Sequence, residues 1–353
     1  GLLTSWELQQ KDGKVIAVIG DGALTGGMAY EALNNAGRTK SKLIVILNDN
    51  NMSIDRSQGA LNGYLLRLSL SHRYNRFKQG LWSLLSHTPA VLNLCRKAGN
   101  AIKHGLLQNS NLFESLGFRY FGRVDGHNVE LLVQTLRSLK NIKSPKLLHI
   151  ITQKGHGYAP AEDNLPVWHA PGRFDPETGV RIKSESKGTK FQDVFGQTLL
   201  DLARTDERVV GITPAMPSGC SMTIMMEAMP ERCFDVGIAE GHAVTFSAGL
   251  AKGGLLPFCN IYSSFMQRGY DNLIHDAALQ RLDMVLCLDR AGIVGEDGPT
   301  HHGAFDLAYL RPVPNITVAS PYDEHELRRL MYTATQPAMG TFVIRYPRGK
   351  GSL

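Results

Sequence analysis

Two polar stretches follow apolar runs early in the chain and could together hold a metal ion. Asp21 lies in Gly-Asp-Gly after the run VIAVI, and Asn50 lies in Asn-Asp-Asn after the run LIVIL. If these runs are neighbouring strands, both side chains emerge at one edge of a sheet. A carboxylate, an amide oxygen and a free backbone carbonyl suit a hard cation such as Mg²⁺, which keeps open positions for phosphate oxygens.

The glycines around Asp21 favour binding of a phosphate group. Gly20, Gly22, Gly26 and Gly27 would let backbone N–H groups approach a phosphate at the start of the next helix. Alone, Gly-Asp-Gly is better explained as a turn and Asn-Asp-Asn as a cap, but the matching strand contexts favour a Mg²⁺–diphosphate site. A Rossmann dinucleotide site is disfavoured, because the loop is not GxGxxG and the second run ends in Asn-Asp-Asn rather than one ribose-binding acid.

A third candidate is a carboxylate in the second half of the chain. Glu240 follows the strand-like run CFDVGIA and opens the helix-like stretch HAVTFSAG. A carboxylate is stabilised at a helix N-terminus, so Glu240 could also be only a cap. His242 follows Gly241 on the same predicted helix, which directs it away from Glu240 and is typical of a packing residue.

Three arginines follow strand-like runs, and two histidines lie side by side. A single arginine is usually solvated, but Arg268, Arg290 and Arg348 at strand ends of one sheet favour convergence on an anion. His301 and His302 could suggest a metal pair. Adjacent residues rarely bind one metal well, and no cysteine or further histidine lies at ligand spacing, so zinc is disfavoured.

The elements that position these residues alternate between strand-like and helix-like patterns. Continuous apolar runs are typical of parallel strands covered on both faces. We therefore predict an α/β fold with two doubly wound, mostly parallel sheets and helices on both faces, whose ligands bind beyond the carboxyl ends of the strands. The predicted strands are 15–20, 43–48, 146–153, 209–213, 233–238, 256–262, 284–290, 316–321 and 341–349. The predicted helices are 26–37, 128–141, 191–203, 242–254 and 323–335.

The alternation stops between residues 159 and 190, where proline, glycine and charged residues dominate. This composition predicts a linker, because long loops are uncommon inside one domain. We therefore expect a first domain over 1–158, the linker over 159–190 and a second domain over 191–353. Residues 62–111 are basic and look helical without clear ends. The chain's start is typical of the last turns of a helix.

Charge and cysteine usage exclude several classes of protein. The formal net charge of +6 is spread over mixed signs, which favours anionic small molecules over nucleic acid as ligands. The five cysteines form no CxxC pair and are interpreted as buried free thiols in a reducing compartment. No apolar run is long enough for a bilayer, and the first residues lack a signal-peptide layout. We expect a cytoplasmic protein of bacterial type, without membrane or nucleic-acid partners.

Eight motifs, in order along nearly the whole chain, make it similar to a known family. They resemble the thiamine-diphosphate-dependent transketolase superfamily, and within it most closely the 1-deoxy-D-xylulose-5-phosphate synthases. The motifs are GDGALTGGMAYEALNNAG, LNDNNMSI, VDGHN, KGHGYAPAE, FDVGIAEGHAVTFSAGLA, IYSSFMQRGYD, DRAGIVGEDGPTHHGAFD and RYPRG. Gly241 departs from the larger polar residue that is common in the family, but Glu240 is in place.

The resemblance implies roles for individual residues. Asp21, Asn50 and the Met52 carbonyl would bind Mg²⁺, and Gly22 and Ala23 would contact the diphosphate. Glu240 would hydrogen-bond the aminopyrimidine ring and promote removal of the thiazolium C2 proton. By the same resemblance, Tyr158 and Phe265 would contact thiamine, and Arg290 and Arg348 would bind the phosphate of glyceraldehyde 3-phosphate. The residues implied around the pyruvate-derived intermediate are Tyr262, Arg268, Asp297 and His301, and His169 would reach the active site.

By the same resemblance, the expected reaction condenses pyruvate with glyceraldehyde 3-phosphate, with loss of CO₂, to give 1-deoxy-D-xylulose 5-phosphate for isoprenoid precursors and thiamine. The family works as a homodimer. We expect this chain to begin inside the first domain and to end before a C-terminal domain. Two alternatives stay open: another transketolase-like enzyme or half of a pyruvate dehydrogenase, and a non-catalytic truncated form.

Overall fold

The computed structural model describes residues 1–39, 41–50, 52, 59–61, 63–65, 111–165, 167–169, 171–182 and 188–351. Most of the predicted helical region 62–111, with Cys95, lies outside these residues. The chain divides into two compact units. Unit 1 comprises Gly1–Asn51 and Gly59–Lys154, and unit 2 comprises Met52–Gln58 and Gly155–Leu353. The domain limits expected from the sequence, at 158 and 190, stay predictions.

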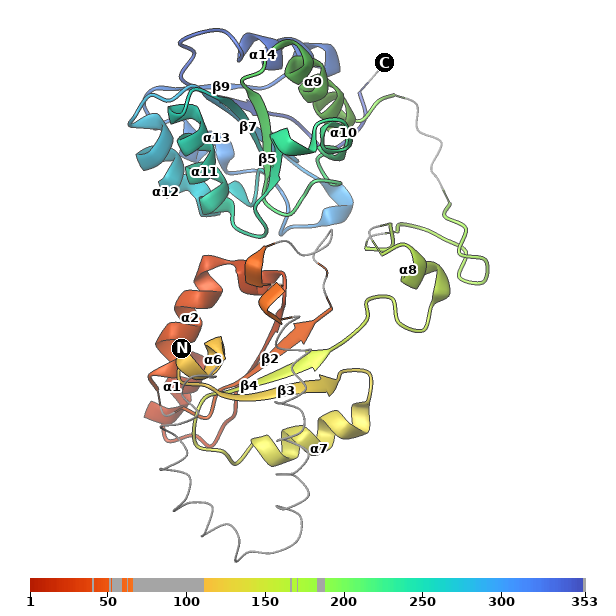
Figure 1. The fold of residues 1–353 in the computed structure, drawn as a ribbon, viewed down its shortest axis with the longest axis vertical. Helices are drawn as coiled ribbons and strands as arrows, with labels where there is room; N and C mark the ends of the chain where they lie inside the picture. Colours follow the sequence, from red (N-terminus) through yellow and green to blue (C-terminus); the bar gives the residue numbers. More distant parts are fainter. Residues whose placement is uncertain are drawn as a thin grey trace, which may run out of the picture. The chain divides into compact units, whose positions relative to one another are not determined.

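Unit 1 is built on four parallel strands in the order β1-β2-β4-β3 (Figure 1). Their bounds are β1 Ile16–Gly20, β2 Ile44–Asp49, β3 Arg119–Asp125 and β4 Lys146–Ile151. The sequence predicted β1, β2 and β4 from their apolar runs. It missed β3, RYFGRVD, because this edge strand alternates exposed charged residues with partly buried ones.

Two of the helices of unit 1, α2 and α6, contribute buried apolar residues to the core against this sheet. The described helices of the unit are α1 Leu2–Leu8, α2 Gly27–Gly37, α6 Leu112–Ser115 and α7 Val129–Leu139. Leu33 of α2 and Phe113 of α6 join Leu47 and Leu147 of the central strands in one buried cluster. The Asn128 side chain accepts a hydrogen bond from the Leu131 amide and so caps α7. The predictions of α2 and α7 are confirmed.

Unit 2 contains six parallel strands in the order β6-β5-β7-β8-β10-β9. Their bounds are β5 Val209–Thr213, β6 Cys233–Asp235, β7 Leu256–Tyr262, β8 Met284–Asp289, β9 Ile316–Ala319 and β10 Thr341–Arg345. Every residue of β7 and β8 is buried. Burial of both faces explains why these central strands were predictable as continuous apolar runs.

Helices cover both faces of the six-stranded sheet (Figure 1). On one face, Phe258 and Val285 pack with residues of α9 Phe191–Thr205 and α14 Glu324–Thr333. On the other face, Leu286 packs with α11 Glu240–Lys252 and with the π-helical turn Leu273–Ala278. The remaining helices are α10 Thr223–Ala228, α12 Tyr270–Asn272 and α13 Asp306–Leu310. The predicted α/β class, with two mostly parallel sheets, is confirmed.

The segment before α9 has more structure than its composition suggested. It contains α8, Ala159–Asp163, and an antiparallel bridge between Phe174 and Arg181. The rings of Tyr158, Trp168 and Phe174 pack together, with centroids 4.8–6.0 Å apart. The sequence predicted no element here because these contacts join residues that no short periodicity relates.

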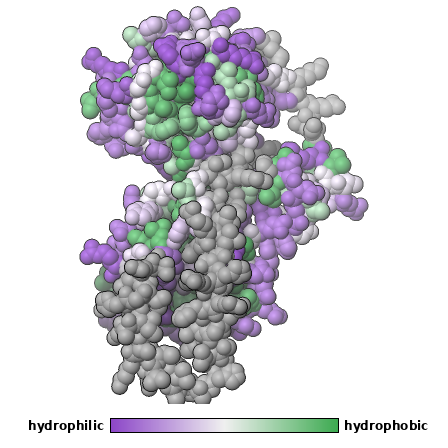
Figure 2. Space-filling model, in the orientation of Figure 1, coloured by the Kyte–Doolittle hydropathy of each residue, from purple (hydrophilic) through white to green (hydrophobic). Residues whose placement is uncertain are grey.

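Buried thiols and a mixed surface complete the fold. Cys220, Cys233, Cys259 and Cys287 are free and buried, as predicted, and burial raises the pKa of Cys259 to about 12. Figure 2 shows polar residues over most of the visible described surface, interrupted by apolar residues, which is normal for a folded chain. Within the described residues, no helix has the length and apolar character needed to cross a membrane.

Candidate functional site

Asp21 and Asn50 follow two strands that are neighbours in unit 1, as the sequence predicted. β1 pairs with β2 in parallel, with Gly20 opposite Asn48. The Asp21 amide donates a hydrogen bond to the Asn48 carbonyl at 3.1 Å, so the pairing continues to the aspartate itself. Asp21 is 3% exposed, and Met52 is also buried. The two strand ends therefore present a carboxylate and an amide at the same edge of the sheet.

The backbone at this edge of the sheet has open space beside two glycines. A Cβ added at Gly20 or Gly27 would meet no atom within 4 Å. The stretch between them turns through a short 3₁₀ helix, Ala23–Thr25, and α2 then begins at Gly27. A carboxylate, an amide and a helix N-terminus with open backbone fit a Mg²⁺–diphosphate group. Among the described residues, no three His, Cys, Asp or Glu side chains gather as a metal cluster.

A buried polar chain that the sequence did not reveal lies beside Asn50. His149 of β4 contacts Asp49 through Nε2, at 2.9 Å, and the Tyr120 hydroxyl through Nδ1, at 2.6 Å. Asp49 ends β2, and Tyr120 lies in β3. His149 is 0% exposed, and the two partners are 6% exposed. These three side chains thus link three adjacent strands, and Asp49 directly precedes the predicted metal ligand Asn50.

In unit 2, Glu240 begins α11, as predicted, and its carboxylate is buried. Arg268 Nη1 donates a hydrogen bond to Glu240 Oε1 at 2.9 Å. The glutamate side chain is only 6% exposed, whereas the arginine side chain is 64% exposed. His242 is exposed and lies against the Phe246 ring, with centroids 5.8 Å apart. Among the described residues, Glu240 is therefore a buried carboxylate that is paired with the largely exposed guanidinium of Arg268.

Aromatic contacts connect this ion pair to other predicted site residues. The Arg268 guanidinium lies 5.7 Å from the centre of the Phe265 ring. Phe265 contacts Tyr262 on one side and His301 on the other, at centroid distances of 5.4 and 5.3 Å. Tyr262 ends β7, so the sheet fixes the start of this chain of contacts.

Arg290 follows β8 in a left-handed conformation, with φ of 61°, which is unusual for a residue with a side chain. Its guanidinium carbon lies 3.8 Å from the centre of the Tyr262 ring. Arg290 Nη1 also donates to Asp289 Oδ2 at 2.7 Å and to the Gly219 carbonyl at 3.1 Å. Burial raises the pKa of Asp289 to about 6, although the charge of Arg290 opposes the shift. The arginine is thus held rigidly at the strand end.

Asp297 lies between two of the predicted anion-binding arginines. Its Oδ1 is 3.1 Å from Arg348 Nη1, and its Oδ2 is 3.9 Å from Arg290 Nε. Arg348 also donates to the Val294 carbonyl at 3.1 Å. The two arginines therefore converge on a carboxylate of the same chain, so their arrangement already accommodates an anion.

The contacts join eight predicted residues of unit 2 into one continuous network. Its members are Glu240, Tyr262, Phe265, Arg268, Arg290, Asp297, His301 and Arg348. Tyr158 and His169 lie instead in the segment around α8. Tyr158 packs in the aromatic trio, and among the described residues its buried hydroxyl has no hydrogen-bond partner. His169 is exposed.

Sequence reasoning missed the carboxylates behind this network. Asp289 ends an otherwise apolar strand next to Arg290, and that charged position was a usable signal. Asp306 is 1% exposed and bonds Ser263 and Arg345. Nothing in the spacing of Asp306 distinguishes it from a helix-capping acid, so only the fold reveals its partners.

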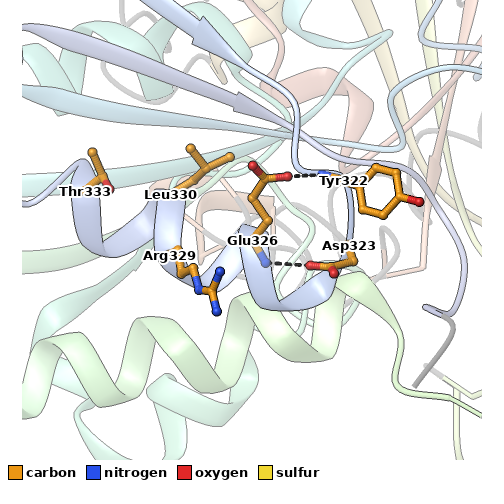
Figure 3. Close-up of a pocket in the computed structure, with 6 residues that line it drawn as sticks. All are labelled: Tyr322, Asp323, Glu326, Arg329, Leu330 and Thr333. Carbon is orange, nitrogen blue, oxygen red and sulfur yellow. Dashed lines mark hydrogen bonds between the residues drawn. The ribbon is translucent and has the colours of Figure 1, made fainter.

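A surface hollow on α14 is unrelated to these residues. Figure 3 shows its lining residues, Tyr322, Asp323, Glu326, Arg329, Leu330 and Thr333. Asp323 accepts a hydrogen bond from the Glu326 amide at 2.7 Å, and the Glu326 side chain accepts one from the Tyr322 amide. These two acids cap the start of the helix, so their positions need no ligand to explain them.

Two family models match the chain, one in each half. Residues 1–152 match a model of 1-deoxy-D-xylulose-5-phosphate synthase, and residues 187–352 match a transketolase pyrimidine-binding domain. A transketolase structure from Campylobacter jejuni is 20% identical, with a TM-score of 0.45, over 97% of this chain and 58% of that one.

Curated relatives are much more similar in sequence. The 1-deoxy-D-xylulose-5-phosphate synthase of Phocaeicola vulgatus is 62% identical over 96% of this chain and 55% of the relative. The protein of the same name from Bacteroides fragilis is 58% identical over 98% of this chain and 54% of the relative. The chain thus spans about half the length of the curated relatives it matches. Together, these matches confirm the resemblance seen in the motifs: the chain belongs to the 1-deoxy-D-xylulose-5-phosphate synthase family.

Proposed function

We propose that this chain carries most of the active site of a thiamine-diphosphate- and Mg²⁺-dependent synthase. It would condense pyruvate with glyceraldehyde 3-phosphate, with loss of CO₂, to give 1-deoxy-D-xylulose 5-phosphate. The observation that carries the proposal is the network of unit 2, which connects a buried carboxylate, Glu240, to two arginines that converge on an anion. Family membership supports the same reaction.

The edge of the first sheet would bind the cofactor's charged end. Asp21, Asn50 and the Met52 carbonyl are the proposed Mg²⁺ ligands, and Gly22 and Ala23 the proposed diphosphate contacts. The support is the parallel pairing of β1 with β2 and the open space beside Gly20 and Gly27. Thiamine diphosphate, when bound, supplies the electron sink that allows the carboxylate of pyruvate to leave as CO₂.

Glu240 would hydrogen-bond the cofactor's aminopyrimidine ring and so promote proton transfer there. A buried carboxylate at a helix N-terminus is well suited to accept a hydrogen bond from a ring N–H group in a dry pocket. Arg268 bonds this carboxylate from a largely exposed position, and the ring N–H group would replace it as the partner of Glu240, because a buried carboxylate without a partner is costly. Tyr158 and Phe265 are the proposed thiamine contacts, and His169 is a further candidate.

The second substrate would bind at the arginine pair. A phosphate group can accept hydrogen bonds from both Arg290 and Arg348, because guanidinium groups suit multidentate anions. Asp297 currently contacts both arginines, so phosphate binding requires either its displacement or a shared contact. Tyr262, Arg268, Asp297 and His301 are the proposed surroundings of the pyruvate-derived intermediate. A homodimer in a bacterial-type cytoplasm is the expected setting.

Calorimetric titration of the whole chain with thiamine diphosphate, with and without Mg²⁺, tests the cofactor half of the proposal. We expect metal-dependent binding that Asp21→Ala weakens at least tenfold. Asp12→Ala is the matched control, because Asp12 is an exposed acid of the same unit, with its side chain 83% exposed. Equal affinity with and without Mg²⁺ in the parent chain would contradict the assigned metal ligands.

Product analysis tests the substrate half. With pyruvate and glyceraldehyde 3-phosphate, we expect release of CO₂ and formation of the deoxy sugar phosphate, both abolished by Glu240→Gln and retained by the exposed control Glu231→Gln. Turnover of sugar-phosphate pairs alone would identify a transketolase-type transferase instead. Cofactor binding without CO₂ release would show that these residues form only part of a working site.

A further inference from the structure

A buried carboxylate behind the site network joins three segments that carry site residues. Asp306 Oδ2 accepts hydrogen bonds from Ser263 Oγ at 2.9 Å and from Arg345 Nε at 3.0 Å. Its Oδ1 accepts from the Leu307 amide at 2.8 Å. The Asp306 side chain is 0% exposed, and that of Arg345 is 16% exposed. Such a shielded ion pair is screened little by solvent and fixes the groups that form it.

Each partner of Asp306 lies next to a residue of the network. Ser263 directly follows Tyr262 at the end of β7. Arg345 ends β10, three positions before Arg348. Asp306 itself begins α13 and ends the loop that contains Asp297 and His301. One carboxylate therefore ties together both strand ends and the loop between them.

The loop itself is closed at its neck just before Asp306. Gly292 and Gly303 exchange two backbone hydrogen bonds, of 2.9 and 2.8 Å. A Cβ at Gly303 would overlap the Ser263 hydroxyl and would approach the Arg290 carbonyl oxygen to 2.6 Å. The neck therefore packs directly on the serine that Asp306 holds. Displacement of Ser263 would disturb the neck and the loop beyond it.

We propose that Asp306 is a positioning residue that fixes the loop of residues 292–303, and so places Asp297 against the arginines and His301 against Phe265. This role rests on the proposed function of the network, but the loop's attachment to Asp306 does not. The hydrogen bonds of Asp306 within the described part of the chain go to Ser263, Leu307 and Arg345, which are not proposed ligand-binding residues. Its effect must therefore pass through Ser263, Arg345 and the glycine neck.

Hydrogen exchange of the whole chain without ligands tests the attachment. We expect Asp306→Asn to speed exchange of backbone amides in 292–303 at least tenfold relative to the strands of unit 2. The control is Leu327→Val, which weakens the core on the other face of the sheet, where Leu327 is 0% exposed. Leu327→Val should raise exchange by a similar factor in 292–303 and in the strands of unit 2. Equal protection of 292–303 in Asp306→Asn and in the control would overturn the proposal.

Ser263→Ala gives a second variant in case Asp306→Asn does not fold. It removes one donor and leaves the Asp306–Arg345 ion pair, so we expect a smaller, roughly threefold rise confined to the same loop. In the holoenzyme, we expect Asp306→Asn to lower kcat at least tenfold while the Kd of thiamine diphosphate with Mg²⁺ changes less than twofold. Equal losses in both quantities would indicate general unfolding and contradict a positioning role. Because exchange needs no ligand, failure of the proposed reaction would not affect that result.

Discussion

At the scale of single residues, the carboxylate of Asp297 determines how the arginine pair meets an anion. Its two oxygens lie 3.1 and 3.9 Å from Arg348 and Arg290. A phosphate dianion that approaches the same guanidinium groups must compete with it. The side chain of Asp297 is 28% exposed, so solvent and ligand can reach it.

Asp297→Asn should therefore strengthen binding of inorganic phosphate to the chain by about threefold to tenfold. Loss of the negative charge removes the competitor, while the amide keeps nearly the same size. Titration with phosphate at constant ionic strength measures the change. Asp323→Asn, in the cap of α14, is the control. Weaker phosphate binding in Asp297→Asn would show that the aspartate helps to organise the arginines rather than competing.

Asp289 predicts a pH dependence of stability. Burial raises its pKa to about 6 in the folded chain, against about 3.9 in an unfolded one. The folded state therefore binds more protons between these values, and the free energy of unfolding should fall as pH rises from about 4 to about 6. The expected fall is about 1–3 kcal/mol.

Urea unfolding at several pH values, in parent and Asp289→Asn chains, measures this contribution. The difference between the two curves should decrease across the same pH window, because the variant cannot lose the proton. Parallel curves would mean that Arg290 holds Asp289 ionised throughout, despite its burial.

At the scale of elements, His149 links three strands of the first sheet through Asp49 and Tyr120. His149→Leu should destabilise unit 1 by about 3 kcal/mol, because it leaves the Asp49 carboxylate buried without its partner. Chemical unfolding, followed by hydrogen exchange of β2 and β4, measures the loss. His156→Leu is a control at an exposed histidine. A loss below about 1 kcal/mol would show that water replaces the imidazole.

Strand patterns were predictable because burial on both faces leaves a signal in the sequence itself. The runs of β7 and β8 are apolar except for Asn260 and Asp289, and every residue in them is buried. β3 was missed because an edge strand needs only one buried face. The aromatic trio around Tyr158 was missed because its members share no short period in the sequence.

The site was predictable where motif residues lie at strand ends, and not where support comes from across the sheet. Glu240 and Arg290 follow strands that the sequence located, so their edge of the sheet followed from topology. Asp306 and Arg345 meet only because β10 lies beside β8. Sequence spacing gives no indication of a contact between residues 39 positions apart.

At the scale of the whole chain, the division after Lys154 predicts a separable unit. A chain of residues 155–353 should fold alone, because it contains both clusters that cover the six-stranded sheet. Calorimetry should show one transition for this piece and a matching transition in the whole chain. If the circular dichroism spectrum of residues 155–353 at 25 °C is that of an unfolded protein, the division is contradicted.

The strand order of unit 2 also bears on how the chain acquires its shape during synthesis. β9 is made before β10, yet it pairs with β10 and lies at the edge of the sheet beyond it. A nascent chain that stops before Thr341 therefore has no place for β9, and β8 is left with an open edge. Open edges invite pairing with other chains. β10 is thus the strand that connects β9 to the rest of the sheet, and incomplete chains that lack β10 should associate through the open edge of β8.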